Sequence, residues 1–268
     1  MNIRRRPPLL AALFVLAVLL CACGVANRQA PGYTLPETGF RAPVSHVVDA
    51  DAAQRVDEQS MLYVYDPLER LNRRTYNFNA MVDRAVLVPV AVGYQWAVPQ
   101  TVRTGVSNVI GNLNEVPCLA NSALQANQNK VNVTLIRLVT NSVLGVGGMF
   151  DVATKLGFER EDEDFGQTLA VWGAPNGAYV VLPLYGPSNV RDTVGTVGDM
   201  VFSYYQMEYL FDAAGISDHA LAGDINTAVR AVDTRANTSF RYYTTDTPFE
   251  YDVLRFAYTK ARAVQVQQ

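Results

Sequence analysis

Two long stretches of this chain carry almost no charge, and this shortage constrains the fold more than any other feature. Between residues 85 and 150 the only charged residues are Arg103, Glu115, Lys130 and Arg137, and residues 165–190 contain none. Prolines and glycines interrupt both stretches, so neither can form a membrane-spanning helix. Two interpretations remain open: amphipathic helices that lie against lipid, or a large buried core whose surface is covered by Asn, Gln, Ser and Thr.

The N-terminus has the layout of a bacterial lipoprotein export signal over residues 1–22. Three arginines, residues 4–6, precede an uncharged run from Leu9 to Leu20, which is shorter than the roughly 20 apolar residues that a membrane span needs. Ala22 is a small residue directly before Cys23, so cleavage there would leave the Cys23 thiol to carry a diacylglycerol. The alternative is an ordinary secretory signal with two incidental cysteines. Gly24 after the anchor favours export to the outer membrane by general lipoprotein sorting rules.

The chain that this cleavage would leave, residues 23–268, is mildly acidic, because losing the three leader arginines leaves 19 basic against 25 acidic residues. Such a chain is a poor nucleic-acid binder, and its net charge does not draw it to anionic lipid. Apart from Cys23 it contains only Cys118, which predicts neither a disulfide framework nor a Cys/His metal site. Residues 23–60 are rich in Ala, Pro, Gly, Thr and acidic residues, and predict a flexible tether.

The rest of the chain predicts an all-α fold. Asp66-Pro67-Leu68-Glu69 is a capping box with Asp66 as the N-cap, and an apolar stripe follows at helical spacing. Asp164 opens a second capping box. Ser188 is the predicted N-cap of a helix with Val190, Val194, Val197 and Val201 on one face, where Gly195 and Gly198 allow another element to approach closely. Further helices are predicted over residues 99–109, 115–125, 128–144 and 218–240, and from residue 247 onward.

One segment departs from the helical pattern. Residues 179–185 are apolar and extended in character, and glycines stand on both sides of them, at Gly177 and Gly186. This pattern predicts a short hairpin-like loop inside a helical protein.

The sequence offers little that could carry out catalysis. Neither a nucleophile elbow nor a phosphate-cradling glycine loop is present. Residues 145–150 are glycine-rich but favour a flexible joint between helices. His46 falls in the predicted tether and His219 at a helix start, so neither is a convincing general base. The acidic run 161–164 could suggest calcium, but it lacks the alternating spacing of an ion loop, and helix capping is the favoured interpretation.

Several sequence blocks, in order, resemble the MlaA/VacJ family of outer-membrane lipoproteins. The opening signature comprises Asp66, Pro67, Leu68, Glu69, Asn72, Tyr76, Asn77, Phe78 and Asn79. Later blocks are residues 111–115 with 121–125, 137–153, 163–173 and 179–192. Three places depart from the family pattern: Val116 separates the usual Glu-Pro pair, Ala126 replaces a glycine, and residues 175–178 replace a more glycine-rich turn.

This resemblance implies a ring-like arrangement of amphipathic helices that lies in the inner leaflet of the outer membrane and encloses a central polar channel. It further implies that residues 61–245 form the helical domain, followed by a C-terminal helix within 246–268. Members of the family remove phospholipid that has strayed to the outer leaflet and pass it to a soluble periplasmic carrier, MlaC, which serves an inner-membrane ABC transporter complex. They also associate with trimeric porins. No cofactor or metal is implied.

The expected mechanism is a polar conduit for lipid headgroups, with no bond broken. The helices of residues 85–144 are expected to turn apolar faces to the leaflet, and the first helix to pack beside the loop. The residues expected to line or gate the channel are Tyr179, Leu182, Pro183, Tyr185, Gly186 and Pro187. Two other classes of function stay open: a porin-associated structural lipoprotein without a lipid path, and a membrane-bound lipid hydrolase or acyltransferase.

Overall fold

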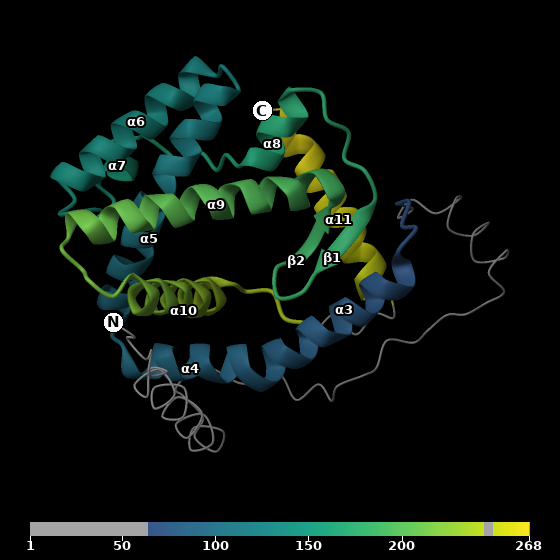
Figure 1. The fold of residues 1–268 in the computed structure, drawn as a ribbon. Helices are drawn as coiled ribbons and strands as arrows, with labels where there is room; N and C mark the ends of the chain where they lie inside the picture. The colour runs from purple at the N-terminus through teal and green to yellow at the C-terminus, as the bar shows by residue number, and fades with distance from the viewer. Residues whose placement is uncertain (1–63, 244–248, 268) are drawn as a thin grey trace, which may run out of the picture.

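The computed structural model describes residues 64–243 and 249–267, and they are almost entirely helical (Figure 1). This confirms the predicted all-α class and the hairpin within it. The elements are α3 (Glu69–Val82), the π-helical η1 (Asp83–Leu87), α4 (Val88–Ala97), α5 (Gln100–Leu124), α6 (Gln128–Val143), α7 (Val152–Lys155), α8 (Phe165–Val171), β1 (Tyr179–Leu182), β2 (Gly186–Asn189), α9 (Val190–Ala213), α10 (His219–Asn237) and α11 (Glu250–Gln267).

The helix α3 begins later than its capping box predicts. Leu68, rather than Asp66, occupies the N-cap position, and the Asp66 carboxylate accepts the Leu68 N–H at 3.1 Å from a turn outside the helix. The reason is tertiary, because the same carboxylate also accepts the Asn72 amide at 2.8 Å and the Tyr251 hydroxyl of α11 at 2.5 Å. Asp66 therefore ties two helices together.

Beyond α3 the chain stays helical through η1 and α4, and residues 85–97 of this segment lie in the stretch where helices were expected. Pro89 lies directly after the π-helical turn and lacks the N–H that a regular helix needs there. A wider turn of this kind accommodates a break in the hydrogen-bond ladder. Inside the turn the buried carboxylate of Asp83 pairs with Arg235 of α10, with a distance of 2.9 Å from Nη2 to Oδ2. The ion pair fixes the middle of this long helical segment to α10.

Residues 100–124 form one helix, α5, where the sequence predicted two, so that prediction is wrong. The polar run that suggested a break is buried against neighbours: a Cβ at Gly148 would overlap the Asn112 side chain, and the Asn112 amide donates to Ser142 of α6 at 3.0 Å. Pro117 lies inside α5 and supplies no N–H for the Leu113 carbonyl. The side chain of Gln206 on α9 donates to that carbonyl at 2.8 Å.

The end of α5 holds one residue that differs from the family pattern. Ala126 replaces the family's glycine and has a φ of 56°, in the left-handed region that glycine adopts most easily. The Asn127 N–H bonds to the Ser122 carbonyl at 3.1 Å, so the chain reverses as it does after a glycine. The alanine bears a local backbone strain that glycine would avoid.

Other boundaries follow the sequence more closely. The predicted cap Asp164 of α8 is confirmed, and Asp218, where a helix was predicted to begin, is the N-cap of α10. Each carboxylate accepts a backbone N–H three residues on, at 2.9 and 3.0 Å. Ser188 was the wrong cap for α9, because it belongs to β2 and Asn189 accepts the Asp192 N–H at 2.8 Å instead. The predicted start of the last helix at residue 247 lies outside the described residues.

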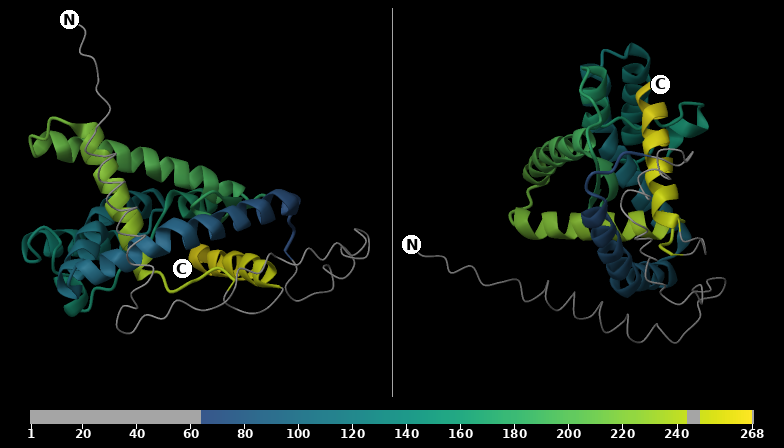
Figure 2. Two further views of the ribbon diagram at one scale, coloured as in Figure 1. Left: turned by 90° about the horizontal axis from the view of Figure 1, so that it is seen from below. Right: turned by 90° about the vertical axis from the view of Figure 1, so that its right-hand side faces the viewer.

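The elements form a closed circuit of contacts (Figures 1 and 2). β1 packs on α3, the hairpin packs on α9, α9 on α10, and α10 on α4, which continues back into α3. α5 pairs with α6 and touches both α9 and α10. This arrangement agrees with the predicted ring. A small apolar core of Tyr76, Tyr179, Val181 and Tyr251 lies between α3, the hairpin and α11.

The described part of the chain buries polar side chains and exposes apolar ones. Fully buried polar and charged residues outnumber fully buried apolar ones by two to one. Large apolar side chains are exposed along α6 and α9, and they include Leu135, Val139, Val143, Val194, Val197 and Val201. The valine face of α9 is thus exposed, whereas its glycines do meet a neighbour: a Cβ on Gly195 would overlap the backbone of Gly166 in α8. Across the described ranges, every helix is too short or too polar to cross a bilayer.

The Pro117 arrangement makes a testable prediction. Gln206→Ala should lower the free energy of unfolding by about 1 kcal/mol, because the Leu113 carbonyl loses its donor. In a Pro117→Ala background the loss should shrink, since the new residue has a backbone N–H that can bond that carbonyl. Denaturant unfolding of the four proteins in detergent measures the coupling. Equal losses in the two backgrounds would refute the role of Gln206 as the donor that Pro117 lacks. Gln128→Ala is the control, because the Gln128 amide serves an exposed partner on its own helix.

Candidate functional site

The β1–β2 hairpin is the only sheet in the described residues, and its tip is exposed. Tyr179 pairs with Asn189 and Leu182 with Gly186. Between the strands, Leu184 and Tyr185 are 61% and 66% exposed. Leu184 has a φ of 66°, which is costly for a branched side chain. A strained, exposed apolar tip on an otherwise secured hairpin is a candidate moving part.

Two asparagines of α3 secure this hairpin by occupying the free edge of β1 and the turn after it. The Asn72 side chain donates to the Tyr179 carbonyl at 3.0 Å and accepts the Val181 N–H at 2.9 Å. Asn79 donates to the Leu182 carbonyl at 2.9 Å and accepts the Leu184 N–H at 2.8 Å. Each side-chain amide thus supplies the donor and the acceptor that a neighbouring strand would supply.

The spacing of the two asparagines matches the spacing of the backbone groups they bind. Asn72 and Asn79 are two helical turns apart, which is about 10.5 Å at 1.5 Å per residue. The two backbone sites are three residues apart along the extended hairpin, which is about 10 Å at 3.3 Å per residue. Both asparagines are buried, at 0% and 3% exposure. All four hydrogen bonds between these asparagines and the hairpin can therefore form while α3 and the hairpin lie side by side.

A cluster of tyrosines supports the hairpin from behind. The Tyr76 ring meets the Tyr251 ring edge-on, with centroids 5.8 Å apart, and its hydroxyl donates to Glu250 of α11 at 2.6 Å. Burial raises the pKa of the Tyr76, Tyr179 and Tyr251 phenols far above the usual range, because the phenolate would lose its hydration. The Tyr179 hydroxyl is buried and has no hydrogen-bond partner.

The base of the hairpin is fixed by a network of charges. Arg191 pairs with Asp192 at 2.9 Å. Tyr258 and Arg262 of α11 donate to the same carboxylate at 2.7 and 2.8 Å. Burial by itself would raise the pKa of Asp192, but the bonds from Arg262 and Tyr258 hold it below its usual value. Arg262 also binds Asp164 at the start of α8, so α11 connects the hairpin to α8.

The structure divides the predicted site residues into two groups. Asp66, Asn72, Tyr76 and Asn79 contact the hairpin or α11. In the hairpin, Tyr179 packs against Tyr251 of α11, and Gly186 is buried. Leu182 accepts the Asn79 amide through its carbonyl, and Glu69 pairs with Arg73 and lies 3.9 Å from Arg255 of α11. Of the remaining residues, Pro67, Leu68, Phe78, Pro183 and Tyr185 are exposed, Asn77 accepts the Tyr243 hydroxyl, and Pro187 is half-buried. Cys23 lies outside the described residues.

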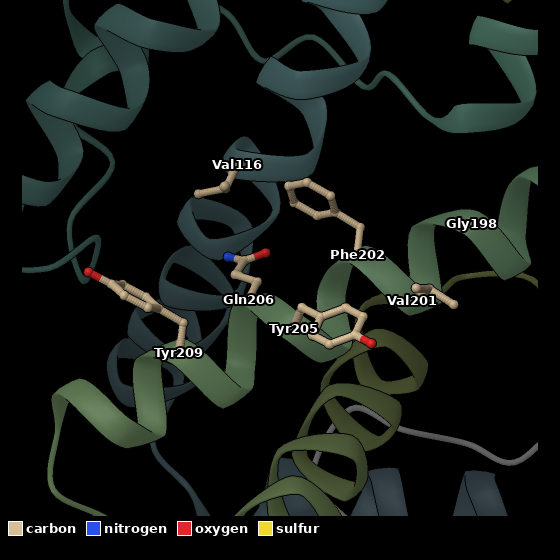
Figure 3. A pocket seen from close by; sticks show the side chains of 7 residues that line it. All are labelled: Val116, Gly198, Val201, Phe202, Tyr205, Gln206 and Tyr209. Carbon is tan, nitrogen blue, oxygen red and sulfur yellow. The ribbon is translucent and has the colours of Figure 1, made fainter.

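A second feature, which the sequence did not predict, is a cavity of about 570 Å³ between α5 and α9 that is open to the surface, with Tyr205 and Tyr209 of its lining 68% and 73% exposed. Figure 3 shows Val116 on α5 and the aromatic side chains on α9 around it. Its main walls are Val116, Val201, Phe202, Tyr205, Gln206 and Tyr209. The signal was present in the sequence as aromatic residues every three to four positions, but periodicity alone does not distinguish a buried face from a cavity wall.

The acidic run and the histidine have structural partners. Glu163 binds Lys130 at 2.5 Å and Asp164 caps α8, which agrees with the capping interpretation. His219 is placed between Glu208, at 2.8 Å, and Asp212, at 3.4 Å, at the corner of α9 and α10. The described residues bring no three His, Cys, Asp or Glu side chains together as a metal site.

Comparison with known proteins gives consistent results. A family model described as MlaA lipoprotein matches residues 64–265. An uncharacterized protein of Rickettsia bellii is 34% identical over 206 residues, which cover 76% of this chain and 78% of that protein. The intermembrane phospholipid transport system lipoprotein MlaA of Escherichia coli is 42% identical over 138 residues, or 50% of this chain and 55% of that protein.

Coverage of the relatives is partial, whereas coverage of a solved structure is complete. The chain spans 56% of the length of the matching protein of Rickettsia typhi, to which it is 38% identical. A solved structure described as "Structural basis for maintenance of bacterial outer membrane lipid asymmetry" is similar with a TM-score of 0.61 and 30% identity. That match covers 76% of this chain and 100% of the other.

The asparagine pairs make a prediction that concerns the hairpin alone. Asn72→Ala or Asn79→Ala leaves a hairpin N–H and carbonyl without partners, which costs about 1–3 kcal/mol. Hydrogen exchange at the amides of residues 181 and 184, respectively, should accelerate by roughly tenfold or more, while α6 amides keep their rates. Arg74→Ala, an exposed change on the same helix, is the control. Unchanged exchange in both asparagine variants would contradict this role.

Proposed function

The chain belongs to the MlaA lipoprotein family, and on this premise we propose that it is the outer-membrane component of a phospholipid transport system. In this proposal it removes mislocalised phospholipid from the outer leaflet and hands it to a periplasmic carrier similar to MlaC. This removal maintains the difference in lipid composition between the two leaflets. The named relatives support the proposal, as does the similarity to a structure concerned with outer-membrane lipid asymmetry.

The observation that carries this proposal is the distribution of polar and apolar side chains. A protein surrounded by water hides apolar groups, but here most of the fully buried side chains are polar, while valines, leucines and aromatics of α6 and α9 are exposed. In hydrocarbon the preference reverses, because polar groups must find partners inside the protein. The pattern fits helices that lie within one leaflet.

The proposed mechanism requires no reaction. A phospholipid that changes leaflet must move a charged headgroup through hydrocarbon, at a high cost in free energy. A polar conduit inside the circuit of helices would lower this cost while the acyl chains stay among apolar side chains. The hairpin tip at Leu184 and Tyr185 would gate the conduit, and the Asn72 and Asn79 bonds would set its resting position.

Location and partners complete the proposal. Acylation at Cys23 would anchor the chain to the inner leaflet of the outer membrane, with the predicted tether of residues 23–60 between anchor and domain. A porin trimer would hold it in place, and the carrier would pass the lipid to an inner-membrane ABC transporter complex. The anchor does not depend on net charge, since each buried CH₂ contributes roughly 0.8 kcal/mol.

Bound lipid tests the central claim. The full chain, extracted in detergent and examined by native mass spectrometry, should carry phospholipid, and incubation with the purified carrier should reduce the bound amount. A folded protein that never carries phospholipid would instead support a structural lipoprotein attached to the porin. Conversion of the lipid into hydrolysed or transacylated products would indicate an enzyme. A porin-free preparation serves as the control for lipid carried by the porin.

The anchor has its own test. Cys23→Ser should abolish the mass added by acylation and release the processed chain from the membrane fraction, because no other residue receives the acyl groups. Cys21→Ser, two positions away and within the predicted leader, should leave acylation and fractionation unchanged. Membrane fractionation and intact-mass measurement follow membrane association and acylation in both variants. Acylated protein from the Cys23 variant would show that the assignment is wrong.

A further inference from the structure

Arg230 on α10 is a half-buried cation without an anionic partner. Its Nη1 donates to the Asn114 side chain at 2.6 Å and its Nε to Asn226 at 3.2 Å. Both partners are neutral amides, and no carboxylate of the described residues forms an ion pair with it. Burial lowers the pKa of this guanidinium, with no nearby charge to offset the loss of hydration.

Arg230 differs in this respect from three arginines that connect elements of the fold. Arg137 is paired with Glu115, Arg235 with Asp83 and Arg262 with Asp192. The acid one turn further along the Arg230 face, Asp233, is buried and accepts the Ser107 hydroxyl at 2.7 Å instead. Removing a charge from water without pairing it is costly, so the position of Arg230 calls for an anion from outside the chain.

Two adjacent residues of α5 connect Arg230 to the α5–α9 cavity. Asn114, which Arg230 binds, directly follows Leu113, whose carbonyl accepts the side chain of Gln206. Gln206 itself lines the cavity, and in Figure 3 it projects from α9 toward α5 among Phe202, Tyr205 and Tyr209. The unpaired cation and the apolar, aromatic cavity are therefore connected through adjacent residues of α5.

We infer that Arg230 binds the phosphate of a phospholipid whose acyl chain enters the α5–α9 cavity, with Asn114 and Asn226 holding the guanidinium in place. The inference rests on the proposed function and assigns residues to the lipid. A phosphodiester carries the missing negative charge, and a guanidinium can present two parallel donors to its oxygens. The cavity volume of about 570 Å³ falls within the roughly 300–1,000 Å³ range of ligand pockets. A molecule with both a phosphate and a hydrocarbon chain uses both halves of the site.

The test compares binding of a soluble short-chain phosphatidylcholine and of inorganic phosphate to the full chain in detergent. Arg230→Gln should weaken phospholipid binding by about tenfold or more, the usual range for a hydrogen bond to a charged group. The phospholipid affinity of Arg230→Lys should lie between those of the unaltered chain and Arg230→Gln, because lysine keeps the charge but cannot present two parallel donors. Arg74→Gln, on the exposed face of α3, should bind like the unaltered chain. Inorganic phosphate should bind far more weakly than the lipid, since it leaves the cavity empty.

A second variant keeps the arginine and covers the case in which Arg230→Gln fails to fold. Asn114→Asp supplies an internal carboxylate at the position of the present 2.6 Å bond, so it should pair with Arg230, keep the fold and still weaken phospholipid binding. A merely structural Arg230 would give the opposite result, with Asn114→Asp stabilising the protein and leaving lipid affinity unchanged.

The outcomes separate this inference from the proposed function. If the unaltered chain binds phospholipid and both Arg230→Gln and Asn114→Asp bind it equally well, the inference is overturned and the transport proposal stands. If the unaltered chain binds no phospholipid, both are overturned. Inorganic phosphate that binds as tightly as the lipid would also overturn the inference, because the cavity would then contribute nothing.

Discussion

The bonds between two asparagine side chains and one β-hairpin hold the rest of the structure in place. A two-stranded hairpin is marginal by itself and leaves one row of backbone groups unpaired on each outer edge. Asn72 and Asn79 satisfy four of these groups from α3. The hairpin thereby joins the start of the helical circuit to α9, and α11 closes the same joint from behind through Tyr251, Tyr258 and Arg262. Without this joint the circuit would be open.

The interior of this protein is organised by polar pairing rather than by apolar packing. Glu115 with Arg137, Asp83 with Arg235, and Asp192 with Arg262 each connect elements far apart in the chain. Although burial raises the pKa of Glu115, the bond from Arg137 opposes the shift, as expected for a carboxylate kept charged by its partner. Among the described residues Arg230 takes no part in this pairing and binds two neutral amides instead. The proposed position within one leaflet would account for both the exposed apolar faces and the paired interior, because in lipid polar groups can find partners only within the protein.

Sequence patterns identified most helices, the hairpin and the family, but not the details that position the site. Local rules place the cap at Asp164 and the start of α10 at Asp218 correctly, because each side chain serves its own helix. They misplace the start of α3, since Asp66 is shared with Asn72 and Tyr251. They divide α5 in two, because only tertiary contacts reveal that Asn112 is buried and that Gln206 replaces the backbone donor that Pro117 lacks. The cavity and Arg230 could not be predicted, as both depend on which helices meet.

The sequence by itself determined the helical class, the shortage of charge and the signature asparagines, because periodicity, composition and residue chemistry are contained in the linear order of the amino acids. The tertiary structure alone decided which polar groups found partners. Pairing depends on distances between residues that are far apart in sequence: Asn72 reaches a backbone 107 positions away, and Arg230 meets an amide 116 positions away rather than an acid. A cation acquires or lacks a counter-charge only when the fold brings its neighbours together.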